Sequence, residues 1–121
     1  MRTLLFAVLP ASALLVPGPA NAQLGSYNDP APGASSLMRS DFTNAEREIR
    51  GAAVAADDPA RAINLGIALA KTGRRGEAAQ LFNSVLAQED VAMIVADGQT
   101  VMSHDLAARA LASLQNGVLS H

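Results

Sequence analysis

The chain contains no cysteine and no tryptophan, and only 3% of its 121 residues are aromatic. Without cysteine, the protein has no disulfides, no thiolate ligands for zinc and no cysteine for lipid attachment. Its two histidines are too few for a histidine-rich metal site. Nine Lys and Arg side chains are outnumbered by eleven Asp and Glu, so no basic excess is available to neutralise nucleic-acid phosphates. The composition therefore predicts no cofactor, no metal and no nucleic-acid partner.

The longest uncharged apolar run lies near the N-terminus, at residues 4–16, and it follows a single arginine. It is followed by Pro and Gly residues and then by an Ala-x-Ala pattern that ends at Ala22. These are the three parts of a secretory signal peptide, and the run is shorter than the about 20 residues that cross a bilayer. We expect residues 1–22 to be cleaved before Gln23. The product would be exported, periplasmic or secreted, and would have no stable membrane anchor.

The cleaved chain would differ from the full chain in charge and in organisation. Residues 1–22 hold one arginine and no acid, so their removal changes the net charge from −2 to −3. Residues 23–40 are rich in Pro, Gly, Ser, Asn and Asp and have no apolar periodicity. We expect this segment to be a flexible leader.

Three apolar stripes with helical spacing follow between residues 41 and 90. Asp41 is placed to cap the first helix, whose apolar face extends to Ala56. Asp58 and Pro59 suit the start of the second helix, which is apolar around most of its circumference and should be the most buried. A short turn joins it to the third helix, so these two should lie antiparallel. The predicted helices cover residues 41–56, 59–72 and 75–88.

The segment from residue 59 to residue 90 resembles a tetratricopeptide repeat. A Leu-Gly pair is followed three residues later by a large apolar residue. The next helix has a small residue, an aromatic residue four positions on and a small residue three further on. The residues that carry this pattern are Leu65, Gly66, Leu69, Ala78, Phe82 and Val85. The resemblance implies a mainly α fold of antiparallel helical hairpins, in which Gly66 and Ala78 are small so that the helices approach closely.

The first and third helices also match each other at one constant sequence offset, with Ala45 opposite Ala78 and Ile49 opposite Phe82. Residues 41–58 would then be the second helix of a preceding half-unit. An array usually needs about three repeats for stability. Either the C-terminal elements or a second subunit should therefore complete the core.

Tetratricopeptide arrays bind peptides or partner segments in a groove lined by the first helix of each hairpin. By this resemblance, the residues that would face a partner are Ile63, Ile67, Ala70 and Lys71. The alternative is that Ile63 and Ile67 are buried under the C-terminal segment.

Residues 91–121 break the repeat. Two apolar runs flank the pair Asp97-Gly98, which favours a type I′ turn and predicts a short β-hairpin. The alternative is a helix to about Ala96 followed by a loop. Ser103 is expected to cap a last helix that covers the open end of the stack.

The adjacent residues Ser103, His104 and Asp105 contain the residue types of a catalytic triad. A triad requires convergent side chains, whereas neighbours at a helix start point in different directions. We therefore predict no catalytic residues. The expected function is that of a non-enzymatic exported module that binds a protein or peptide. A homodimer or assembly subunit is the alternative, and a small exported enzyme is the least favoured hypothesis.

Overall fold

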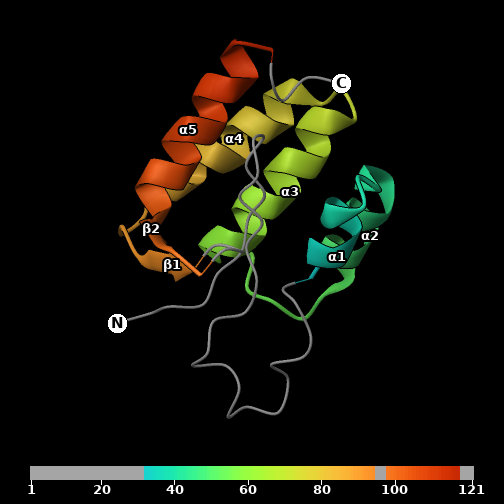
Figure 1. Cartoon of the computed structure of the whole chain (residues 1–121), viewed down its shortest axis with the longest axis horizontal. Helices are drawn as coiled ribbons and strands as arrows, with labels where there is room; N and C mark the ends of the chain where they lie inside the picture. Colours follow the sequence, from blue (N-terminus) through green and yellow to red (C-terminus); the bar gives the residue numbers. More distant parts are fainter. Residues whose placement is uncertain (1–31, 95–97, 118–121) are drawn as a thin grey trace.

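The computed structural model describes residues 32–94 and 98–117, which form five helices and one two-stranded antiparallel sheet (Figure 1). The fold is mainly α with a β-hairpin before the last helix, as predicted. The predicted signal peptide, its predicted cleavage site and the start of the predicted leader lie outside the described residues. The elements are α1 (Ala34–Met38), α2 (Phe42–Gly51), α3 (Pro59–Lys71), α4 (Arg75–Leu86), β1 (Ala92–Ile94), β2 (Thr100–Met102) and α5 (Ser103–Gln115).

Helix α3 is the centre of the molecule, because α1, α2, α4 and α5 all pack against it (Figure 1). Asp58 caps it, since its carboxylate accepts the Arg61 N–H at 3.0 Å, and Pro59 fills the first turn. All its residues except Arg61 and Lys71 are buried, which confirms that it is the most buried helix. One of them is polar: Oδ1 of Asn64 is buried and accepts no hydrogen bond from the described residues.

Helices α3 and α4 form the predicted hairpin, and a glycine sets how closely they approach. A Cβ built on Gly66 would lie 2.5 Å from Cε1 of Phe82. The Phe82 ring, which is fully buried, therefore lies directly against the α3 backbone. All six residues of the predicted packing pattern are buried: Leu65, Gly66, Leu69, Ala78, Phe82 and Val85.

Helices α1 and α2 repeat this packing at the same sequence offset that relates the first and third predicted helices. A Cβ built on Gly33 would lie 2.6 Å from Cγ1 of Ile49, just as one on Gly66 would meet Phe82. Ala45, the counterpart of Ala78, is also fully buried. The equivalence predicted between single helices thus extends to a pair of hairpins, α1–α2 and α3–α4.

The turns of the two hairpins have the same backbone hydrogen bonds. The Asp41 N–H donates to the Ser36 carbonyl at 2.8 Å, and at the equivalent positions of the second hairpin the Arg74 N–H donates to the Leu69 carbonyl at 2.8 Å. Each turn also contains one residue with positive φ, Ser40 at 60° in the first and a glycine at 90° in the second. The internal repeat is therefore present in backbone geometry as well as in packing.

The existence of α1 corrects the last part of the flexible leader predicted over residues 23–40, whereas residues 23–31 lie outside the described residues. Leu37 is 3% exposed, and the buried Ser36 hydroxyl donates to the Glu48 carboxylate at 2.9 Å. The helix has five residues, so it is too short to show a helical period in the sequence. Its order comes from packing on α2 rather than from its own propensity.

Helix α2 ends at Gly51, five residues before the predicted end at Ala56. Ala52 has extended backbone angles, with φ −80° and ψ 149°. The residues from Ala52 to Ala56 are exposed or half-buried, so continuing the helix would bury no further apolar surface. Helix propensity alone is too weak to hold a short extension.

The predicted β-hairpin is confirmed, and the alternative of a helix to Ala96 is wrong. Ala92 pairs with Met102, and Ile94 pairs with Thr100. A two-residue turn at positions 97 and 98 would, without a bulge, pair Ile94 with Val101 instead. The observed register is thus one position away from the predicted type I′ turn, part of which lies outside the described residues.

Helix α5 is capped by a residue from outside the helix, because Ser103 is its first helical residue and not its N-cap. The Asp90 carboxylate accepts the His104 N–H at 2.8 Å and the Ser103 hydroxyl at 3.2 Å. The Ser103 hydroxyl in turn accepts the Val91 N–H at 2.9 Å. The prediction that Ser103 caps α5 is therefore wrong. Asp90, which precedes the hairpin in the sequence, caps the helix.

Candidate functional site

A groove of about 280 Å³ runs across α3 between α2 and α4. Its apolar floor consists of Leu65 and Leu69 of α3, which are 2% and 1% exposed, and of Leu81 of α4, which is half-buried. Its walls are polar. The residues that line it are Arg50, Arg61, Leu65, Leu69, Glu77, Gln80, Leu81 and Ser84.

The helical period explains why these residues share a groove. Arg61, Leu65 and Leu69 recur every four residues, so they form one stripe along α3 with a rise of about 6 Å per step. Glu77, Leu81 and the neighbouring polar residues follow the same period on α4. The two stripes face each other because the hairpin holds α3 and α4 side by side.

The two arginine side chains at the groove differ in how many of their N–H groups are hydrogen-bonded. The Arg61 side chain is half-buried and makes no hydrogen bond or ion pair with a described residue; only its backbone N–H is bonded, to Asp58. The Arg50 side chain is 47% exposed, and its Nε donates to Glu46 at 2.8 Å. The terminal Nη groups of Arg50 make no bond with the described part of the chain. Guanidinium donors are thus available among the residues that line the groove.

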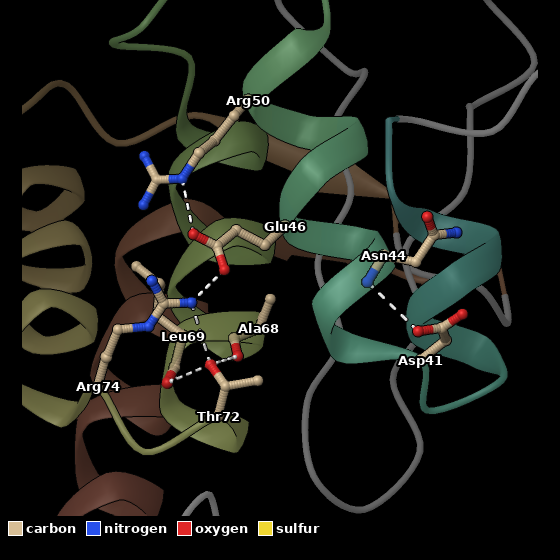
Figure 2. Close-up of polar contacts among 8 residues, drawn as sticks. All are labelled: Asp41, Asn44, Glu46, Arg50, Ala68, Leu69, Thr72 and Arg74. Carbon is tan, nitrogen blue, oxygen red and sulfur yellow. Dashed lines mark hydrogen bonds and ion pairs between the residues drawn. The ribbon is translucent and has the colours of Figure 1, made fainter.

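Glu46 fixes Arg50 in place and also links α2 to the turn between α3 and α4. Figure 2 shows its carboxylate between Arg50 and Arg74, with an ion pair to each. The Glu46 side chain is 16% exposed. The hydrogen bond from Arg74, with a smaller contribution from Arg50, holds the pKa of Glu46 below its ordinary value of 4.5. The carboxylate is therefore ionised at neutral pH and anchors the Arg50 wall of the groove.

Three of the four partner-facing residues predicted from the resemblance are not accessible. Ile63, Ile67 and Ala70 are each at most 1% exposed, and Lys71 is half-buried at the end of α3. The alternative prediction, burial of Ile63 and Ile67, is therefore the correct one. A partner could not contact these three side chains without opening the core.

Ser103, His104 and Asp105 do not converge. The Ser103 hydroxyl bonds with Asp90, and His104 Nε2 lies 2.7 Å from the Gln88 carbonyl oxygen. Asp105 pairs with Arg109 at 2.6 Å. Each side chain thus has its own structural contact, and the three residues do not form a triad.

Within residues 32–94 and 98–117, no group of three or more His, Asp or Glu is placed to bind a metal ion. In the same part of the chain, every helix is too short or too polar to cross a bilayer. Compared with protein-family models, with curated proteins and with solved structures, the chain matches none.

The sequence pattern that marks the groove is one that also predicts core packing. Leu65 and Leu69 are predicted packing residues, and at 2% and 1% exposed they belong to the core, so of the three lining leucines only Leu81 offers the groove a substantial apolar surface. The interval of four residues that begins at Arg61 marks the stripe. Only the position of α2 shows that this stripe lies between two helices.

Proposed function

We propose that this protein is a non-enzymatic binding module, exported from the cell, that holds a peptide segment of a partner protein in the groove between α2, α3 and α4. The observation that carries the proposal is the groove itself, with its leucine floor and polar walls. Its volume of about 280 Å³ is below the 300–1,000 Å³ of typical small-molecule pockets. It suits one or two side chains of a longer ligand rather than a whole cofactor.

The proposal places the site on a tetratricopeptide-like core. The two hairpins related by one constant offset support that choice, as does the contact between Gly66 and Phe82. The groove differs from the one that the resemblance implied, because it lies on the side of α3 that carries Arg61 and Leu65. Export is supported by the signal-peptide pattern of residues 1–22.

A display library of random peptides, panned against the purified protein, tests the binding function. Ser84 lines the groove and is exposed, so Ser84→Trp should fill the groove without disturbing the core. Asn83 is the exposed neighbour outside the groove, and Asn83→Trp is the matched control. Selected peptides should bind the wild type and the control variant but not Ser84→Trp. Equal binding to both tryptophan variants, or no selected peptide at all, would refute the proposal.

A further inference from the structure

The groove has an electrostatic asymmetry that its apolar floor does not explain. Arg50 and Arg61 both line it, and both have guanidinium N–H groups that bond with no described residue. Glu77 is the only carboxylate among the lining residues. A half-buried guanidinium such as that of Arg61 gains more from an anionic partner than a fully exposed one, because water screens the interaction less.

We propose that the groove selects peptide segments in which an acidic side chain accompanies an apolar one, with the carboxylate bound by Arg61 and Arg50. This inference rests on the proposed function, whose ligand it specifies. The planar guanidinium matches a carboxylate with two parallel N–H donors. The apolar side chain of the ligand packs on the half-buried side chain of Leu81.

The test uses the peptides selected on the wild-type protein, each synthesised with its Asp and Glu residues and again with the corresponding amides. Binding is measured by isothermal titration calorimetry at low and high salt. For the wild type, the amide versions should bind about tenfold more weakly, the loss expected for one charge-assisted hydrogen bond at a partly exposed site. In Arg61→Gln, which keeps Arg50, the preference for the acidic version should shrink, whereas the affinity for the amide version stays at its wild-type value. High salt should reduce the preference in the wild type.

The matched control is Arg109→Gln, which removes an exposed arginine of α5 that pairs with Asp105 away from the groove. It should retain the wild-type preference. Selected peptides without acidic residues, or an Arg61→Gln variant that keeps the full wild-type preference, would overturn the inference. If Ser84→Trp still abolishes binding in that case, the groove remains the binding site and only the acidic specificity is wrong. If Ser84→Trp has no effect, the proposed function itself fails.

Discussion

Replacing Gly66 with alanine tests the close contact between α3 and α4. The new Cβ would lie 2.5 Å from Cε1 and 2.9 Å from Cζ of Phe82, distances at which atoms must move. The ring is fully buried and cannot rotate into solvent, so the two helices must separate or the ring must leave its preferred rotamer. Overpacking of this kind typically costs about 1–3 kcal/mol.

The same substitution also has a favourable part, because alanine loses less backbone entropy in a helix than glycine. That gain is about 0.5–1 kcal/mol. Because a 2.5 Å contact is far inside the normal approach of two carbon atoms, the overpacking cost should lie in the upper half of its range, and the expected net loss in the free energy of unfolding for Gly66→Ala is about 1–2.5 kcal/mol. For a domain of this size, such a loss lowers the melting temperature by about 4–20 °C. Urea and thermal denaturation followed by circular dichroism in the far ultraviolet measure both quantities.

Two further variants separate the steric effect from propensity. Gly76 lies near the start of α4, and a Cβ there would meet nothing within 4 Å, so Gly76→Ala should be neutral or stabilising. Phe82→Leu removes the ring, so the cost of Gly66→Ala should fall by more than about 0.5 kcal/mol in that background. A Gly66→Ala variant as stable as the wild type, or strictly additive effects with Phe82→Leu, would refute the packing argument.

Three further predictions concern polar groups. Asp90→Ala should lower the free energy of unfolding by about 1 kcal/mol, because α5 loses its cap, and urea titration with no such loss would contradict the capping role. Glu46→Gln should lower the melting temperature at pH 7, because the ionised Glu46 carboxylate stabilises the fold. The difference between the two melting temperatures should shrink as the pH falls below 4.5 and the carboxylate becomes protonated. A difference in melting temperature that does not change with pH would rule out this role of the charge. Asn64→Leu should raise the free energy of unfolding by about 1 kcal/mol, because the buried Oδ1 accepts no hydrogen bond from the described residues, and a loss of stability would show that the amide has a partner.

The helical core was predictable because its signals are local. Asp58 before Pro59 marks the start of α3, and the small and aromatic residues of α3 and α4 recur at helical spacing. The hairpin was predictable from two apolar runs around a Gly. The end of α2 was not, since the residues after Gly51 favour a helix and only the absence of a surface to cover explains why it stops there.

Features that depend on tertiary contacts were missed. Helix α1 is shorter than two turns, so the sequence shows no helical period there. It is held in place by contacts with Ile49 and Glu48 of the next helix. The Ser103 cap was wrong because Ser103 is itself the first helical residue and the Asp90 carboxylate accepts the His104 N–H. The groove was predicted on the wrong side of α3, because a helix that is apolar on nearly every side does not reveal which side its neighbours leave open.

The cap on α5 ties the start of that helix to a segment that precedes the hairpin. Asp90 and His104 are separated by 14 positions, and the hairpin lies between them. The amide can gain its cap only after this loop has closed, so the entropy of loop closure must be lost before the first turn of α5 is stabilised. Opening of the hairpin should therefore release that turn as well. In native-state hydrogen exchange, the hairpin amides and those at the start of α5 should behave as one cooperative unit, separate from the central helix.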